Sequence, residues 1–207
     1  MALRLITGRS GQGKTEYLVQ EVIRLSMENP QQKYYVIVPE QFSLEMQRKM
    51  VKKHPRHGFF NIDVLSFHRL AYRIFDECGY QPGEILEDLG VSMMLRKILS
   101  EGENNFLYFK KSMKKAGFID ELKSMLMEFI GYGVTWEQVE EVSEKLGENK
   151  ALSNKCKELG RINEHFDNAI EGRFMVKEQI LDVAREFATE APMITNAVSY
   201  FDGFAGF

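Results

Sequence analysis

The sequence predicts an α/β fold, in which a parallel sheet is covered by helices on both faces and carries a large inserted all-helical subdomain. Three observations support this prediction. Apolar runs of strand length alternate with helical patterns over about the first 80 residues, which is typical of a doubly wound sheet. From about residue 87 to residue 190 the pattern is helical almost throughout. Strand character returns only at residues 197–201.

The first 80 residues contain three units of a strand followed by a helix. The run Tyr34–Val38 is continuously apolar, as in a parallel strand that is buried on both faces. Ser66 precedes a helical pattern and is a candidate N-cap, because its hydroxyl can accept a hydrogen bond from the first turn. The expected strands are 3–7, 34–38 and 59–65, and the expected helices are 16–27, 42–53 and 66–78.

The helical stretch divides the chain into two expected domains. Residues 1–86 and 191–207 are expected to form the α/β domain, and residues 87–190 the inserted helical subdomain. Within the subdomain, Thr135 and Gln138 fit a capping box at the start of a helix. Further helices are expected over about 151–170 and 175–188. The methionines and aromatic residues of this stretch are expected to pack its core.

Residues 8–15 read GRSGQGKT and fit the phosphate-loop pattern G-x-x-x-x-G-K-[ST]. Glycines let the backbone curl so that its N–H groups surround a phosphate chain. The lysine would reach the β- and γ-phosphates, and the threonine hydroxyl would ligate Mg²⁺. The flanking strand and helix patterns provide the context that the motif requires. The predicted nucleotide contacts are Gly8, Arg9, Ser10, Gly11, Gln12, Gly13, Lys14 and Thr15.

Asp202 follows the last expected strand and is the second candidate for the magnesium site. In phosphate-loop proteins a carboxylate at such a position organises Mg²⁺, whereas the alternative is a simple Asp-Gly turn. Phosphate-loop helicases carry glutamate at the next position, where it polarises the attacking water. Here that residue is Gly203, which can neither accept a proton nor orient water. The sequence therefore predicts a protein better equipped to hold a nucleotide than to cleave it.

Composition and charge exclude several classes of protein. The net charge is −3, so any binding to nucleic acid would have to depend on local basic patches. Cys78 and Cys156 show no metal-ligand or redox spacing, which indicates a reduced, cytoplasmic protein. We identify no signal peptide, no apolar run long enough to cross a membrane, and no metal-ligand spacing among the four histidines.

Two clusters of basic residues are candidate local patches. For each cluster, a solvated surface is the alternative to a nucleic-acid site. The spacing of the second cluster places two i/i+4 pairs along one face of an expected helix. The first cluster comprises Arg48, Lys49, Lys52, Lys53, His54, Arg56 and His57, and the second comprises Lys110, Lys111, Lys114 and Lys115.

Six stretches of the sequence are informative when they are taken together. They are the phosphate loop GRSGQGKT, IVPEQFSLEMQ (37–47), VLSFHRLAYRIF (64–75), GVSMMLRKIL (90–99), GFIDELKSMLMEF (117–129) and YFDGF (200–204). Together they resemble AddB or RexB, the family of B subunits of bacterial ATP-dependent helicase/nucleases. The resemblance covers nearly the whole chain in the same order. It departs from the family at Leu3–Thr7, which replaces a strand that contains phenylalanine.

The resemblance implies that the α/β domain is a truncated, RecA-like P-loop NTPase domain that binds ATP and Mg²⁺. Family members are longer helicase and exodeoxyribonuclease subunits that act in DNA double-strand break repair and recombination. They form a heterodimer with the A subunit of the same helicase/nuclease, which is the motor. Their iron–sulphur cluster belongs to a C-terminal part that lies outside these residues, so neither cysteine is expected to hold it.

The resemblance also suggests which residues face DNA. Residues 39–47 and 65–69 match positions where helicase motifs contact single-stranded DNA, and an aromatic residue flanked by cations suits stacking on bases. The alternative for two of these residues is structural, with Phe67 in the core and Ser66 as a helix cap. The DNA-binding candidates are Gln41, Ser66, Phe67, His68 and Arg69.

Two other functions remain open at this stage. A small phosphate-loop kinase would need an acceptor base and an arginine-bearing lid, and the helical stretch offers few arginines. A non-catalytic scaffold would bind a nucleotide only to stabilise its fold. The sequence leaves open the nucleotide base, the oligomeric state and the surface that meets a partner protein.

Overall fold

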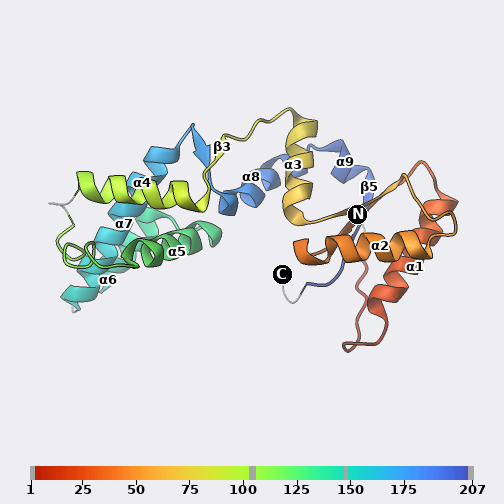
Figure 1. Cartoon of the computed structure of the whole chain (residues 1–207), viewed down its shortest axis with the longest axis horizontal. Helices are drawn as coiled ribbons and strands as arrows, with labels where there is room; N and C mark the ends of the chain where they lie inside the picture. The colour runs from red at the N-terminus through yellow and green to blue at the C-terminus, as the bar shows by residue number, and fades with distance from the viewer. Residues whose placement is uncertain (1–2, 103–105, 147–148, 205–207) are drawn as a thin grey trace. The chain divides into compact units, whose positions relative to one another are not determined.

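The computed structural model describes residues 3–102, 106–146 and 149–204, and it is a mixed α/β structure (Figure 1). The chain divides into two compact units. The first unit combines Met1–Gln81 with Leu181–Phe207, and the second unit is Pro82–Ile180. The first unit is therefore made of two separate stretches of chain. Each unit is described by itself below.

The first unit is built on a parallel sheet with the strand order β2-β1-β5. Its strands are β1 (Lys33–Ile37), β2 (Ile62–Leu65) and β5 (Ala197–Phe201). In the register of the sheet, Val36 lies between Val64 and Tyr200. Because all three strands run in the same direction, the segments that follow them emerge at one edge of the sheet.

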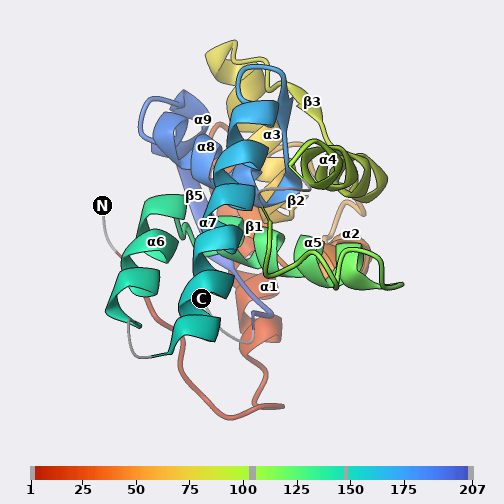
Figure 2. The same ribbon diagram turned by 90° about the vertical axis from the view of Figure 1, so that its left-hand side faces the viewer.

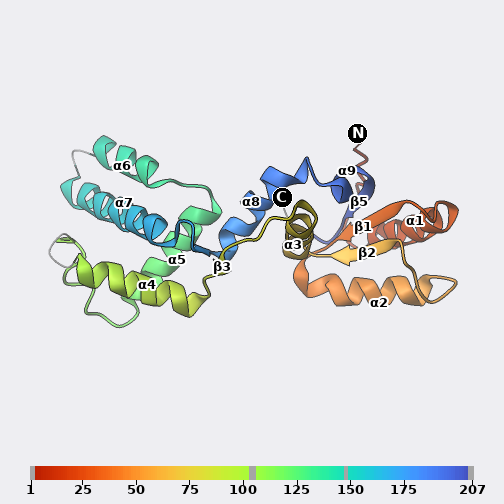
Figure 3. The same cartoon turned by 90° about the horizontal axis from the view of Figure 1, so that it is seen from above.

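Helices cover both faces of this sheet (Figure 3). On one face, α1 (Lys14–Glu28) and α2 (Ser43–Lys53) pack against apolar side chains of β1 and β2. On the other face, Ile37 and Leu65 pack against residues that include Leu70 and Met193. These last two residues belong to α3 (Phe67–Cys78) and α9 (Pro192–Thr195). The prediction of a parallel sheet with helices on both faces is confirmed.

The second unit is mainly helical, and α7 (Lys150–Ile170) packs between α6 (Trp136–Lys145) and α4 (Asp88–Glu101) (Figure 2). Its buried core includes Leu95, Leu122, Ile162 and Phe166. Thr135 and Gln138 form the predicted capping box at the start of α6. The helices are α4 (Asp88–Glu101), α5 (Phe118–Gly131), α6 (Trp136–Lys145) and α7 (Lys150–Ile170).

The remaining elements lie where the chain crosses between the units. Two short strands, β3 (Glu84–Ile85) and β4 (Phe174–Met175), pair in parallel within the second unit, and no sequence pattern predicted them. The chain then passes through the 3₁₀ helix η2 (Lys177–Gln179) into α8 (Ile180–Ala188). The expected helix over 175–188 therefore begins later than the sequence indicated. No helix in the described parts of the chain is long and apolar enough to cross a membrane.

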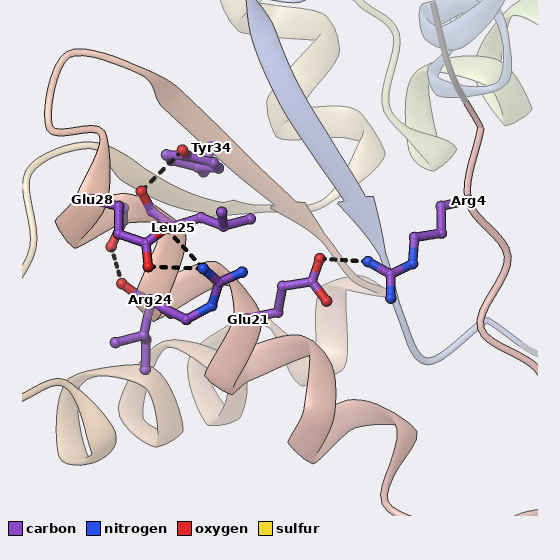
Figure 4. Close-up of polar contacts among 8 residues, drawn as sticks. Arg4, Glu21, Arg24, Leu25, Glu28 and Tyr34 are labelled. Carbon is purple, nitrogen blue, oxygen red and sulfur yellow. Dashed lines mark hydrogen bonds and ion pairs between the residues drawn. The ribbon is translucent and has the colours of Figure 1, made fainter.

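The predicted strand at Leu3–Thr7 is wrong. Residues 3–9 have no regular secondary structure, and the side chains of Leu3 and Leu5 are 86% and 76% exposed. Apolar character alone does not make a strand, because a strand needs a neighbour to share its backbone hydrogen bonds. The segment instead contacts α1 through side chains, since the Arg4 guanidinium donates to the Glu21 carboxylate at 3.0 Å. A dashed line marks this contact in Figure 4.

Two further predictions need correction. The expected strand over 59–65 is shorter, because β2 begins only at Ile62. Residues 107–117 form successive turns and not a helix, so the four clustered lysines do not share a helix face. The turns close through local backbone hydrogen bonds, such as those from the Ser112 and Met113 N–H groups to the Phe109 carbonyl at 2.8 and 2.9 Å.

Candidate nucleotide site

The loop of residues 8–15 is shaped by its glycines and by one side chain. Gly11 and Gly13 adopt φ angles of 78° and 80°, in the left-handed region that favours glycine. The Gln12 side-chain oxygen accepts a hydrogen bond from the Arg9 N–H at 2.8 Å. This bond links the two sides of the loop and acts as a brace. A Cβ at Gly8 would lie 2.9 Å from that same oxygen, so a larger residue there would displace the brace.

Helix α1 begins at Lys14 and points its N-terminus into the loop. Its N-cap is Gly13, and within the described residues no side chain caps this helix end. The N–H groups of the first turn and the helix dipole therefore favour an anion at this point. The Lys14 side chain folds back over the loop, and its ammonium donates to the Gly8 and Arg9 carbonyls, both at 3.0 Å. It therefore adds a full positive charge at the loop.

Glu16 is an acidic residue in the first turn of α1, and it faces α2. Its carboxylate pairs with the ammonium groups of Lys53 and Lys49, the latter at 3.6 Å. The hydrogen bond from Lys53 is the main cause that lowers the pKa of Glu16. These two lysines offset the negative charge that would otherwise weaken the attraction of the loop for an anion.

The loop meets the sheet edge at Thr15 and Asp202. The Thr15 hydroxyl donates to the Asp202 carboxylate at 2.8 Å, although the two residues are 187 positions apart in the chain. The Asp202 N–H in turn donates to the Ile37 carbonyl at 3.1 Å, which continues the pairing of β1 with β5 by one residue. The carboxylate is thus positioned by the sheet, and both side chains are partly buried.

Gly203 has a left-handed backbone, which the sequence alone did not reveal. Its φ angle is 82°, and a Cβ there would lie 3.5 Å from the Pro39 Cδ and 3.8 Å from the Phe42 ring. The neighbouring atoms would tolerate a side chain, but the backbone conformation would strain it. The chain bends at Gly203 directly after Asp202, while the Asp202 carboxylate stays hydrogen-bonded to the Thr15 hydroxyl.

The five DNA-binding candidates lie just beyond the carboxyl ends of β1 and β2, at the edge that carries Asp202. Gln41 is exposed in the 3₁₀ helix η1 (Glu40–Phe42), and His68 and Arg69 are exposed in the first turn of α3. Ser66 is buried and caps α3, because its hydroxyl accepts the Arg69 N–H at 3.4 Å. Phe67 is partly buried against the face of the sheet that contains Ile37.

Phe67 is part of an aromatic group that sequence reasoning did not identify. Its ring stacks on Phe201 with a centroid distance of 5.9 Å and contacts Phe204 at 5.2 Å. Both partners come from the segment that carries Asp202. The signal was present in the stretch YFDGF, where phenylalanines flank the Asp-Gly pair on both sides. The aromatic group therefore connects the start of α3 to the end of β5.

The donor set fits magnesium and does not fit an iron–sulphur cluster. A carboxylate and a hydroxyl are hard oxygen ligands of the kind that Mg²⁺ binds, usually with several waters and substrate phosphates. Within the described residues, no group of three or more His, Cys, Asp or Glu side chains could form a metal site. The chain has two cysteines, both free, whereas an iron–sulphur cluster typically takes four.

The fold and the loop define a mixed α/β protein in which a phosphate-loop sequence meets a carboxylate at the edge of a parallel sheet. Comparison with known families is more specific. The family model described as "ADDB, N-terminal" matches residues 5–207, and the chain belongs to this family. The resemblance inferred from the sequence is therefore confirmed.

Similar proteins are named as the B subunit of an ATP-dependent helicase/deoxyribonuclease. The protein from Lachnoclostridium phytofermentans is 34% identical and that from Acetivibrio thermocellus is 32% identical, each over 207 residues. A Bacillus mycoides protein is 31% identical over 215 residues. All three alignments cover 100% of this chain and 18% of the relative. The chain thus spans less than a fifth of the length of these helicase/deoxyribonuclease subunits.

Proposed function

We propose that the first unit is a RecA-like nucleotide-binding domain that holds ATP with Mg²⁺ and hydrolyses it slowly or not at all. The observation that carries this proposal is the hydrogen bond of 2.8 Å between Thr15 and Asp202. A phosphate-loop sequence alone predicts only a phosphate cradle. The contact with a carboxylate that is positioned by the sheet supplies the second half of a magnesium–nucleotide site.

Each residue of the site has a defined part in this proposal. The backbone N–H groups of residues 8–15 and the N-terminus of α1 hold the phosphates, and Lys14 neutralises their charge. Thr15 and Asp202 hold Mg²⁺, which supplies charge neutralisation at the phosphate oxygens. Gly203 provides no general base, so the nucleotide acts on structure and on DNA engagement.

We extend the proposal to DNA because relatives of this chain are named helicase/deoxyribonuclease subunits. Gln41, His68 and Arg69 are the exposed candidates at the sheet edge, and they suit contacts to bases and phosphates. The chain would then be an ATP-binding module of a larger protein that acts in DNA double-strand break repair and recombination. Its partner would be the A subunit of the helicase/nuclease, in the cytoplasm.

The second unit is, in this proposal, a helical subdomain inserted into the RecA-like domain. The support is that the first unit is formed by two separate stretches of chain on either side of Pro82–Ile180. The nuclease activity and the iron–sulphur cluster of the family would belong to other parts of a longer protein. The two cysteines of this chain would play no part in that cluster.

The proposal is tested by titrating the 207-residue chain with ATP and Mg²⁺ while following binding and phosphate release. Lys14→Ala should weaken binding at least tenfold, because the charge over the loop is lost. Lys52→Ala, which removes an exposed cation of α2, is the matched control and should bind as the unmodified chain does. Phosphate release should stay near the background rate. Rapid turnover, or transfer of phosphate to a small acceptor, would contradict the proposal.

A further inference from the structure

A hollow of about 300 Å³ in the second unit is lined by three cations. Arg96 projects from α4, and Lys110 and Lys114 belong to the segment of residues 106–117, here called the lysine segment. Among the described residues, no acidic side chain lines the hollow. All three residues are exposed. Three positive charges around one open hollow favour an anionic ligand, because their mutual repulsion is relieved when an anion binds.

Some basic residues of the second unit are paired with carboxylates, and the three cations of the hollow are not among them. Lys97, Lys145 and Lys177 each pair with a carboxylate, at 3.9, 2.6 and 3.1 Å respectively. In the parts of the chain that the structure describes, Arg96, Lys110 and Lys114 form no ion pair. Their charges are therefore available to a ligand.

The rest of the hollow supports binding by charge. Leu99, Met113 and Ile119 form its apolar wall. The Ser100 hydroxyl also lines the hollow, but it donates its proton to the Lys97 carbonyl at 2.8 Å. The charged donors among the lining residues are the Arg96 guanidinium and the ammonium groups of Lys110 and Lys114. Such a set matches a phosphate oxygen cluster, for which arginine and lysine are the common protein partners.

The lysine segment is anchored and not merely a surface loop. The buried carboxylate of Glu158 accepts the backbone N–H groups of Tyr108 and Phe109 at 2.6 and 3.0 Å. The rings of Phe106 and Phe109 are also buried in the core of the unit. Because these anchors hold its first half, the segment presents its lysines at defined positions above the core.

We propose that this hollow binds a phosphate group of a DNA backbone. Lys111 and Lys115 lie on the same segment and would meet neighbouring phosphates of the polymer. The choice of DNA over another phosphate ligand rests on the proposed function of the chain. The cationic hollow itself does not depend on the nucleotide site.

The test measures binding of fluorescent single-stranded and duplex oligonucleotides to the whole chain by anisotropy at several salt concentrations. The variant combines Arg96→Ala, Lys110→Ala and Lys114→Ala. The matched control combines Lys150→Ala, Lys157→Ala and Arg161→Ala, which removes the same charge from α7. We expect the first variant to bind duplex at least about tenfold more weakly, with a salt slope reduced by about 3. The control should keep most of both.

Each outcome decides the proposal. Equal losses in both variants would mean that only net charge matters, and no loss in either would mean that DNA does not use the hollow. Inorganic phosphate at millimolar concentration serves as a competitor. If it displaces the labelled DNA as well as an oligonucleotide that contains the same concentration of phosphate groups, the ligand is not a polymer and the assignment to DNA is overturned. ATP binding is measured on the same proteins. If the unmodified chain binds ATP but not DNA, the inference about the hollow is wrong and the nucleotide site is unaffected.

Discussion

At the scale of single residues, the backbone at Asp202 and Gly203 determines where the Asp202 carboxylate lies and which residues position 203 can accept. The carboxylate is positioned by the hydrogen bond from its own N–H to Ile37, and it accepts the Thr15 hydroxyl. Gly203 follows with a left-handed φ of 82°. A glutamate inserted there to restore a general base would introduce a strain of about 1–2 kcal/mol. If the Gly203→Glu variant hydrolyses ATP slowly, the cause could be this strain, so the result would not show whether a glutamate at position 203 can act as the general base.

His54 makes the stability of the first unit sensitive to acid. Burial, with smaller contributions from Arg56 and His57, lowers the pKa of His54 below the ordinary value of 6.5. The unfolded chain therefore binds a proton more readily, so the free energy of unfolding should fall as the pH drops through about 6.5. Denaturant titrations over this range of pH should show the loss, and His54→Gln should reduce it.

The matched control for this prediction is His68→Gln, since His68 is exposed on α3. Its variant should keep the full pH dependence of the unmodified chain. If His54→Gln and His68→Gln retain the same slope of stability against pH, another group is responsible for the acid sensitivity.

At the scale of elements, Ser66 distinguishes a helix cap from a DNA contact. Its hydroxyl is buried and accepts the Arg69 N–H, so Ser66→Ala should lower the free energy of unfolding by about 1 kcal/mol. DNA affinity should not change, because the side chain is not accessible to a ligand. Arg69→Ala, in contrast, should weaken DNA binding and leave stability almost unchanged. A large loss of DNA affinity in Ser66→Ala would show that the cap role is incomplete.

Elements with their own local signals were predictable from the sequence. The strand at residues 197–201, the Ser66 cap of α3 and the Thr135 capping box all occur as predicted, because each depends on neighbouring residues. The errors involve distant partners. Leu3–Thr7 has strand composition but no neighbouring strand among the described residues, and the lysine segment is held in turns by Glu158, which is 50 positions from Tyr108.

In the candidate site, too, the features encoded by neighbouring residues were predictable from the sequence, and those that depend on distant residues were not. Residues 8–15 were recognisable because a contiguous motif encodes the loop. The contact of Thr15 with Asp202 was only a hypothesis, since the order of the strands decides which carboxylate reaches the loop. The aromatic group around Phe67 and the cationic hollow were not predicted, because each brings together side chains from separate elements.

At the scale of the whole molecule, the chain enters and leaves the second unit through adjacent strands. In β3 and β4, Ile85 pairs with Met175, and the Leu86 N–H donates to the Met175 carbonyl at 2.8 Å. Gly83 lies so close to the other strand that a Cβ would be 3.0 Å from the Arg173 carbonyl oxygen. The point where the chain enters the second unit and the point where it leaves are therefore close enough to be joined by a linker of a few residues.

This arrangement predicts that the second unit is removable. Replacing residues 84–174 with three glycines should leave a folded chain that binds ATP within about threefold of the unmodified affinity. Circular dichroism and ATP titration would measure both properties. DNA binding through the cationic hollow should be lost in the same protein. Failure of the shortened chain to fold would contradict the independence of the two units.

We propose above that the loop of residues 8–15 and Asp202 together form a magnesium–nucleotide site. Its most direct test is the affinity of the chain for ATP with Mg²⁺ and with excess EDTA, measured calorimetrically for the unmodified chain, Asp202→Asn and Asp76→Asn. Asp76 is an exposed carboxylate of α3 in the same unit and serves as the control. We predict that Mg²⁺ strengthens ATP binding at least tenfold in the unmodified chain and in Asp76→Asn, but hardly at all in Asp202→Asn. Equal strengthening in all three proteins would show that Asp202 has no part in holding the metal.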